Sequence, residues 1–584
     1  MQNFQAIEIN KNCIERKKMK INIENISFSR YGSFLSVSYY KEEKELGKGL
    51  YIRNIRGGDE DSGDFLLAEM LEDGVLVNYG IDMEHERLKL IGKKGEIELI
   101  ISEKNEIRIR GKNCSLRLTL NNQSYDHIIS HENNNWEFNS YSKHIKSMFV
   151  PLSGKTVITA PWNEERSERV QAEICGESFE CVLHFYKSVY LPKEKYKDFD
   201  LCLEEIKKEF SAWLESFPVP VKYKEENALA AYVLWNNTVY SEGVLTHDAV
   251  YMSKNWMTNI WSWDNCFVAM ALIENHPELA WAQLEAFYSV QDESGLFPDY
   301  INDRYASFSC CKPPVHGWAV KYMYEKNPEF FKDKLEMIYN MLSGWTNFWL
   351  TYRTHKNDPI PKYYHGNDSG WDNSTVFHDG GPLESPDLIS FLILQMNYLS
   401  ELAKELSLND KTEFWKNKSN EFLKILINEF WNGEKFISKK IENNKKIPVT
   451  KGDSLISYIP LILGKLLPEN ISDKMISALK EDGRFLTDYG LATESLKSPF
   501  YNSDGYWRGP VWAPVMMLMT DALYRTGEIE FSKELSARYL NLVHTGGLAE
   551  NFDAKTGKGL RDKGFAWTSA VFLILNNSFE RTNE

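Results

Sequence analysis

The apolar and polar positions of the chain follow two different periods, which meet near residue 200. From about residue 5 to 195, short segments alternate apolar and polar residues, and clusters of Gly, Asn and Asp separate them. A period of two residues with turn signals at this spacing predicts an antiparallel β-sandwich. Segments with this alternation are 33–41, 49–55, 96–101, 106–111, 114–120 and 180–190.

Beyond residue 223 the apolar residues recur with the helical period instead. Twelve helices arranged as six hairpins would close into a double-layered (α/α)6 barrel. A helical solenoid is the alternative, but no repeat of fixed length is visible to support it. The twelve predicted helices cover 225–240, 263–275, 277–291, 315–326, 328–352, 385–407, 409–432, 454–466, 468–482, 510–526, 529–545 and 565–579.

The segment between the two regions has the features of a linker. A helix is predicted over 199–215, and Pro218 and Pro220 follow it, where proline ends a helix. At 584 residues the chain is also longer than one ordinary core accommodates. We therefore expect a β-sandwich domain, a helical linker and an (α/α)6 barrel catalytic domain. Their expected bounds are 1–195, 196–222 and 223–584.

Aromatic residues are frequent, with 17 Trp, 30 Tyr and 31 Phe. They indicate either a large core or a sugar-binding pocket in which indoles stack on pyranose rings, and composition leaves both open. The net charge of -15 disfavours a nucleic-acid partner, which needs basic patches, and fits a neutral substrate better than a polyanion. We expect the one basic cluster worth naming, Arg16, Lys17, Lys18 and Lys20, to be a solvated end.

The start of the chain, MQNFQAIEINKNCIERKK, has no apolar segment of the kind found in secretory signals. No run of about 18 apolar residues occurs, so we expect no membrane association. The 8 cysteines are scattered and form no Cys-x-x-Cys pair, which disfavours a disulfide framework and a zinc site. We therefore expect a cytoplasmic protein.

Several segments between the predicted helices are longer than a connection needs. They are rich in Trp, Gly, Asp and Asn, which favours ordered loops that line a site. Long loops in a compact domain are usually functional or disordered, and in a helical barrel they would surround one mouth of the inner ring. These loops are 292–314, 353–384, 483–509 and 546–564.

Two of these loops carry candidate catalytic carboxyl groups. The loop 363–384 contains Asp368 and Asp372, and Trp371 precedes the second. A carboxyl group packed against an indole is desolvated, which raises its pKa and lets it donate a proton near neutrality. Glu550 lies in the last loop, and an acid from each side of a cleft is what glycoside hydrolysis requires. The alternative for 363–384 is an Asp/Asn/Gly cluster that forms turns or resembles a calcium site.

Three further segments offer groups for binding a sugar. Trp263 and Asp264 begin a predicted helix and offer a stacking face and an acceptor, although Asp264 also suits the helix dipole. Arg508 could donate to hydroxyl groups or brace its own loop. A lone histidine such as His316 is more often structural than catalytic. The remaining residues of these segments that we select are Lys312, Trp318, Trp507 and Trp512.

Five motifs, in this order, resemble glycoside hydrolase family 63, which includes processing α-glucosidases and is related to the trehalases. They are WSWDNCF, KPPVHGWAV, GNDSGWDNS, YWRGPVWAP and AENFDAKTGKG, and they lie between about 255 and 570. The resemblance implies a β-sandwich before an (α/α)6 barrel, in agreement with the periodicity. No motif is identified in the N-terminal half.

The resemblance also implies roles for particular residues. Asp372 matches the general acid of the family and Glu550 its general base, while Asp368 is a rival acid in the same loop. Asp264 with Trp263 matches the pair that holds hydroxyl groups of the cleaved sugar. Many relatives carry Gln where this chain has Lys312. A cation at this position could change which sugar the subsite accepts, and it leaves an acidic aglycone as one possible substrate group. The other residues at pocket-lining positions are Trp371, Trp507, Arg508 and Trp512.

The resemblance implies an inverting mechanism without a cofactor. Inverting enzymes hold their carboxyl groups roughly 6.5–9.5 Å apart, against about 5–5.5 Å in retaining enzymes. Because the acid must be protonated and the base ionised, we expect Asp372 to be the more buried and the pH profile to be bell-shaped. A pocket closed by loops favours an exo-acting enzyme on a short α-glucoside or a similar glycoside, and glycosyl-glycerate compounds are among the open substrates.

Other functional classes are less well supported. A disaccharide phosphorylase of similar architecture replaces the base with a phosphate site, which the presence of Glu550 disfavours. A sugar epimerase relies on histidines, and few of the 12 His lie in the loops. In a non-catalytic carbohydrate-binding protein, the candidate acid and base would have no role in catalysis. Calcium binding at 59–64 or 368–379 is open, but neither segment has the EF-hand spacing.

Overall fold

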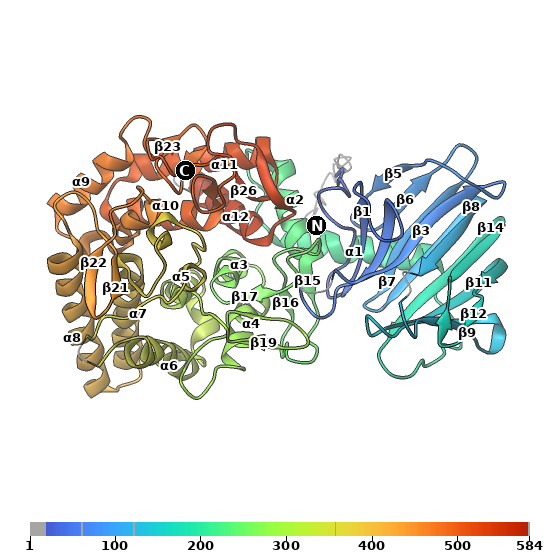
Figure 1. The fold of residues 1–584 in the computed structure, drawn as a ribbon, viewed down its shortest axis with the longest axis horizontal. Coiled ribbons are helices and arrows are strands. Elements are labelled where there is room, and N and C mark those ends of the chain that lie inside the picture. Colours follow the sequence, from blue (N-terminus) through green and yellow to red (C-terminus); the bar gives the residue numbers. More distant parts are fainter. Residues whose placement is uncertain (1–18, 60–61, 121–122, 357, 582–584) are drawn as a thin grey trace, which may run out of the picture.

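The computed structural model describes residues 19–59, 62–120, 123–356 and 358–581 (Figure 1). A β domain lies beside a larger helical domain, as the strand and helical periods predict. The predictions for the start of the chain, including most of its basic cluster, lie outside the described residues, as does part of the acidic segment 59–64.

The β domain is built on one antiparallel network of twelve strands among the described residues. The prediction of an antiparallel β domain is confirmed. The segments 106–111 and 114–120, predicted as two strands, form one continuous strand that pairs along most of its length with β14. The main path is β1 (Leu35–Tyr40), β2 (Gly49–Asn54), β3 (Asp64–Glu72), β8 (Glu106–Leu120), β14 (Gln171–Tyr186), β11 (Ile145–Thr159), β10 (Trp136–Ser140) and β9 (His127–Ser130). The strands off this path are β4 (Val75–Leu76), β5 (Gly80–Met83), β6 (Leu88–Ile91) and β7 (Glu96–Glu103).

The helical domain follows helix α1 (Phe199–Ser216), which packs against β7 and α2. The helices lie close to their predicted ranges. They are α2 (Lys224–Asn237), α3 (Asp264–Leu272), α4 (Pro277–Tyr288), α5 (His316–Lys326), α6 (Leu335–Tyr352), α7 (Pro386–Glu405), α8 (Asn409–Ile425), α9 (Glu469–Leu479), α10 (Ala513–Thr526), α11 (Ile529–Gly546) and α12 (Ala566–Arg581).

The helix predicted over 454–466 is instead the 3-10 segment η6 (Leu455–Leu466). Pro460 lies inside it, and proline has no N–H with which to continue an α-helical ladder. Gly464 has φ 57, which departs from the helical path, and an ideal Cβ there would lie 2.7 Å from the side chain of Arg525. Local chemistry therefore overrides the apolar pattern at this position.

Six helical segments of the described chain make a closed circuit of contacts. Helix α3 packs against α5, α5 against α7, α7 against η6, η6 against α10, α10 against α12, and α12 again against α3. The others lie outside this circuit: α4 against α3, α6 and α8 against α7, α9 against η6, α11 against α10, and α2 against α12. Each of these contacts joins an outer segment to an inner one.

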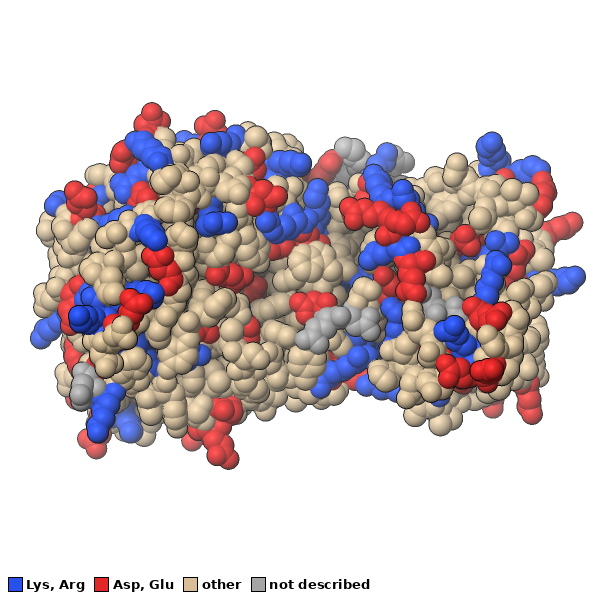
Figure 2. Space-filling view, viewed as in Figure 1, with Lys and Arg blue, Asp and Glu red and all other residues tan. Residues whose placement is uncertain are grey.

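The two domains are held together by buried polar contacts. Lys254 is 1% exposed, and its amine donates to the carbonyls of Ser33 and Thr238 at 2.6 and 3.0 Å. The backbone N–H of Gly57 in the β domain donates to Asp303 of the helical domain at 2.7 Å. On the face drawn in Figure 2, acidic and basic side chains are interspersed without a continuous basic area. None of the described helices is long and apolar enough to cross a membrane.

Candidate active site

The predicted site residues gather at one end of the inner circuit, where its helices begin. Asp264 is the first residue of α3, and His316 is the first residue of α5. Trp512 directly precedes α10, and Glu550 comes shortly before α12. The loop with Asp372 leads into α7. Segments far apart in the sequence are thus brought to one mouth.

A continuous group of tryptophans forms the floor of this mouth. The Trp371 and Trp507 ring centroids are 4.9 Å apart, and Trp507 stacks on Trp512 at 4.0 Å with an interplanar angle of 4°. Trp512 meets Trp567 edge-on at 5.4 Å, and Trp263 lies 6.1 Å from Trp507. These rings are almost completely buried, which fixes the positions of the polar groups attached to the same segments.

Glu550 lies on a short strand, β26 (Ala549–Phe552), although the sequence places it in a loop. This strand pairs with β25 (Val511–Trp512) on one side and with β27 (Gly559–Lys563) on the other. The Glu550 side chain is 1% exposed, and its Oε2 has no hydrogen-bond partner in the described chain. Burial and the nearby Asp562 carboxyl raise its pKa to about 8.

Asp372 is partly exposed, in contrast to the expectation that it is the more buried of the two acids. Its loop turns so tightly that a Cβ on Gly366 would lie 1.9 Å from the Asp372 carbonyl oxygen. Burial still raises its pKa, the Lys312 cation lowers it, and the Asp299 carboxylate raises it. The expectation is wrong because Asp372 lines an open pocket, whereas Glu550 is covered by its own hairpin.

The pocket beside Asp372 has a volume of about 340 Å³. Arg508, His365, His378 and Phe500 line it together with Asp372. Arg508 therefore lies beside the candidate acid, and its Nε has no partner among the described residues.

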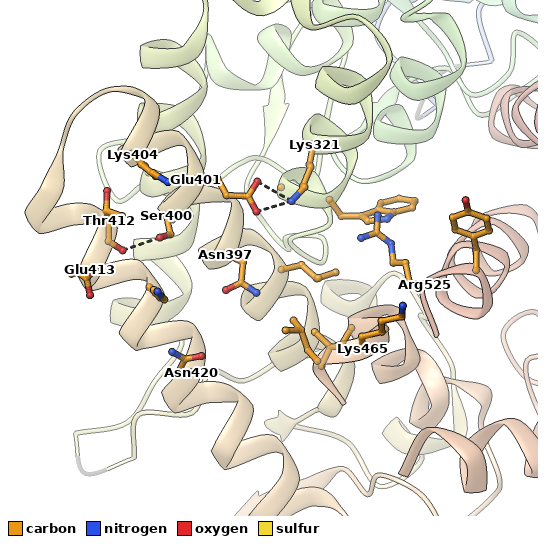
Figure 3. Close-up of a pocket in the computed structure, with 18 of the residues that line it drawn as sticks. Lys321, Asn397, Ser400, Glu401, Lys404, Thr412, Glu413, Asn420, Lys465 and Arg525 are labelled. Carbon is orange, nitrogen blue, oxygen red and sulfur yellow. Dashed lines mark hydrogen bonds and ion pairs between the residues drawn. The ribbon is translucent and has the colours of Figure 1, made fainter. Parts of the chain in front are cut away.

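A larger cavity, of about 1250 Å³, lies elsewhere, among the C-terminal halves of α7, η6 and α10 (Figure 3). One of its two glutamates, Glu401, is bound by Lys321 at 2.7 Å. No pair of free carboxyl groups faces another across it among the described residues. The candidate active site is therefore the mouth that carries the predicted residues. The pocket of about 340 Å³ adjoins it at Asp372, and its lining includes neither Glu550 nor Asp264.

Burial lowers the pKa of Lys312, but Asp299, Asp372 and Asp264 lie near enough for their negative charges to raise it overall. The Lys312 amine is ion-paired with Asp299 at 3.1 Å and donates to the carbonyl and side-chain oxygens of Asn367. An ammonium group has three donors, and two of them go to Asn367, while the ion pair with Asp299 holds the charge. Burial raises the pKa of Asp264 to about 8, with Lys312 opposing the shift, and its Oδ2 has no partner in the described chain. Asp264 thus remains available to a ligand.

Two of the predicted candidates, His316 and Asp368, have surroundings that favour a structural role. His316 is 1% exposed and packs against Phe297 and Trp345, with centroids 4.9 and 5.9 Å away. Burial lowers its pKa to about 3, so it is neutral. Asp368, the rival acid, is ion-paired with Arg353 at 2.8 Å and accepts from the N–H groups of Cys311 and Tyr364. A carboxylate held in this way organises its loop.

Tyr506 is a site residue that the sequence reasoning missed. Burial raises its pKa, followed by the negative charges of Glu550, Asp372 and Asp264, so three carboxyl groups lie near this phenol. The Tyr506 hydroxyl in turn lowers the pKa of Glu550. It has φ 62, a left-handed conformation that is uncommon outside glycine and often marks functional sites. Its place beside Trp507 in a selected motif was the available signal.

No group of three or more His, Cys, Asp or Glu side chains that could hold a metal ion occurs in the described ranges. Asp368 is paired with Arg353 at 2.8 Å, and Asp379 is paired with Lys451 at 2.7 Å. The loop is thus held by protein contacts at these two carboxyl groups.

The helical domain matches a known family. The profile of the mannosylglycerate hydrolase MGH1-like glycoside hydrolase domain covers residues 257–568, which is more than half of the chain. The chain belongs to this family. It is therefore a glycoside hydrolase, as its five motifs imply, and the matched residues include every selected site residue.

Two comparisons link this glycoside hydrolase to family 63. The mannosylglycerate hydrolase of Thermus thermophilus is 22% identical over 393 residues, which are 54% of this chain and 93% of that protein. The crystal structure of a family 63 mannosylglycerate hydrolase from the same species, in complex with glucose, has a TM-score of 0.51 at 19% identity. It covers 60% of this chain and 99% of that one, so these relatives correspond to the helical part.

A third comparison includes the β domain of this glycoside hydrolase. A bacterial glucoamylase, whose structure was determined with acarbose, has a TM-score of 0.64 at 12% identity. It covers 97% of this chain and 95% of that one. At this identity the likeness shows the fold alone, and it confirms a β domain followed by a helical domain.

Proposed function

We propose that this glycoside hydrolase is an inverting, exo-acting enzyme on a short α-glycoside, with Asp372 as general acid and Glu550 as general base. We further propose that the circuit of inner and outer helices is the (α/α)6 barrel. The catalytic domain would then span 223–584, after a β-sandwich at 1–195 and a helical linker at 196–222. The reaction uses no cofactor.

The observation that carries this proposal is the position of Tyr506. Burial raises the pKa of this phenol and the negative charges of Glu550, Asp372 and Asp264 raise it further, so the three carboxyl groups lie near one side chain. The stacked tryptophans lie on the same segments. An indole face with nearby acceptors is what a pyranose ring and its hydroxyl groups require.

The proposed chemistry divides between the two acids. Asp372, protonated, gives its proton to the glycosidic oxygen as the bond to the anomeric carbon breaks. Glu550, ionised, takes a proton from water that attacks the opposite face of that carbon, so the released sugar has inverted configuration. The raised pKa of Asp372 favours its role. Burial raises the pKa of Glu550 to about 8, so the base role requires a pH at which this carboxyl is ionised.

The substrate class follows from the relatives and from Lys312. Relatives named mannosylglycerate hydrolase favour a short α-glycoside with a small aglycone. Lys312 does not add to this argument, since Asp299 and Asn367 engage its amine. We therefore assign recognition of the sugar to Asp264, Arg508 and the tryptophans, and we leave the aglycone to experiment.

The test is the release of sugar from α-glucosyl and α-mannosyl glycerate and from a panel of α-linked disaccharides. Wild type and Glu550→Gln are compared with and without phosphate, and proton NMR records the anomer formed first. Phosphate-independent release of the β-anomer, absent from Glu550→Gln, is the expected result. First release of the α-anomer would contradict inversion, and sugar 1-phosphate formed only with phosphate would identify a phosphorylase instead.

A further inference from the structure

Arg561 joins the loop that carries Tyr506 to the hairpin that carries Glu550. Its guanidinium Nη1 is paired with Asp504 Oδ1 at 2.5 Å. Its Cζ lies 4.9 Å from the centre of the Tyr506 ring, over the face of the ring, and Nη1 also donates to Asn551 Oδ1 at 3.4 Å. A single cation therefore contacts both segments that border the Glu550 carboxyl.

The backbone at Arg561 is also unusual. The β26–β27 register shifts between Ala549 and Asn551, opposite Arg561, and Arg561 has φ 57. A left-handed conformation costs a non-glycine residue about 1 kcal/mol or more, so the surrounding contacts must hold it. The bulge brings the backbone of Asp562 close to the Glu550 carboxyl, where its N–H lowers the pKa of that group. Strain at this position coincides with the proposed base.

We propose that Arg561 is a positioning residue for Glu550, which latches the 503–508 loop onto the β26–β27 hairpin and supplies the positive charge beside the base. The inference rests on the proposed role of Glu550. It adds a function to a residue that lies outside the indole floor and outside the pocket of Asp372.

The charges around Glu550 explain why such a residue is needed. Burial and the Asp562 carboxyl favour the protonated form of Glu550, whereas Arg561 and the Tyr506 hydroxyl favour the ionised form. Asp562 is itself held by the Asn255 side chain at 2.8 Å, so it does not move away from Glu550. Since a base must be ionised to accept a proton, Arg561 is the one cation named among these neighbours that supports the role.

The ion pair contributes little to the stability of the fold. The Arg561 and Asp504 side chains are 27% and 67% exposed, and pairs at such positions contribute about 0–1 kcal/mol. Variants of either residue are therefore expected to fold, which allows their effect on the reaction to be measured.

The experiment measures kcat/KM from pH 5 to 10 for wild type, Arg561→Gln and Arg561→Lys, on the substrate found in the panel. Arg561→Gln is expected to move the acidic limb of the profile to higher pH, so that activity falls about threefold or more at pH 6 and recovers at pH 9. Arg561→Lys keeps the positive charge, so the acidic limb of its kcat/KM profile should lie close to that of wild type. The matched control is Arg538→Gln, since Arg538 is also 27% exposed and paired with a glutamate, Glu534, on α11.

A second variant separates the latch from the charge. Asp504→Asn releases the loop but keeps Arg561, so kcat/KM should fall by a similar factor at every pH while the limb stays in place. If Arg561→Gln follows the wild-type profile, the positioning role is wrong. If it only lowers the profile uniformly, as Asp504→Asn is expected to do, Arg561 acts as a latch and its charge does not act on Glu550. If Glu550→Gln is as active as wild type, the proposed function fails instead, and the two failures are thus distinct.

Discussion

The loop that carries Asp372 and the hairpin that carries Glu550 hold their carboxyl groups in different ways. Asp372 is partly exposed at a pocket, in a loop braced by Lys312 with Asn367 and by Arg353 with Asp368. Glu550 is 1% exposed on a paired strand, with bulge and loop contacts around it. The acid side therefore meets the solvent, and the base side is enclosed.

This difference matches the separate requirements of a general acid and a general base in the proposed reaction. A general acid must be reprotonated after each turnover, and contact with the pocket provides a path for the proton. A general base must hold one water molecule in a defined place, which a rigid hairpin achieves better than a loop. The enclosure has a consequence, because it raises the pKa of the group that must be ionised.

The largest effect tests whether both sides are needed. Asp372→Asn and Glu550→Gln should each lower kcat/KM on a natural glycoside about a thousandfold, because general acid–base catalysis contributes about 10²–10⁴. Steady-state kinetics measures the loss, and an unchanged circular dichroism spectrum shows that the fold is intact. Most of the activity remaining in Asp372→Asn would transfer the acid role away from this residue.

The next effect separates the acid from the base. A glycosyl fluoride releases fluoride without protonation, so Asp372→Asn should keep about a hundredfold more of its activity on the α-fluoride than on the natural glycoside. Glu550→Gln should lose activity on both substrates alike. The opposite pattern would exchange the two roles, as the greater burial of Glu550 taken alone would suggest.

The same comparison shows how far the sequence allows prediction. The spacing of apolar residues predicts the β domain, the helical domain and most helices, because each element buries one face and so repeats apolar residues at its own period. They fail at η6, where Pro460 and Gly464 act locally. The sequence motifs bring Asp264, Asp372 and Glu550 into view, but no periodic pattern marks the partners that set their environment. Asp299 for Lys312 and Arg561 for Glu550 are visible only after folding.

The expected burial order was wrong for a related reason. Trp371 beside Asp372 predicts a desolvated acid, and the sequence places Glu550 in a loop. The strand β26 is only four residues long and depends on pairing with β25 and β27. Such short pairings carry no periodic signal, so the more enclosed side of the site was read as a loop.

A smaller effect tests the brace on the acid side. Asp368→Asn removes a buried charge from its pair with Arg353 and should lower the free energy of unfolding by about 3 kcal/mol. Activity per folded molecule should fall much less than in Asp372→Asn. Urea denaturation and kinetics at low temperature measure the two quantities. Loss of activity at full stability would instead make Asp368 the acid.

The smallest effect concerns the enclosure of the base, through the pH dependence of stability. The pKa of Glu550 is about 8 in the folded protein and 4.5 as its ordinary value, so the folded state holds this proton more tightly. The resulting stability is complete below pH 4.5 and is lost as the pH rises through 8. Glu550→Gln cannot lose a proton, so its Tm should equal that of wild type near pH 4.5 and exceed it by about 3–6 °C at pH 9.

The Tm of Asp264→Asn should differ from that of wild type in the same direction, since burial raises the pKa of Asp264 as well. Asp372→Asn should show a smaller Tm difference, because Asp372 is more open to solvent. A Tm difference that is constant across this range would mean that Glu550 titrates normally, and the contrast between an open acid and an enclosed base would then be lost.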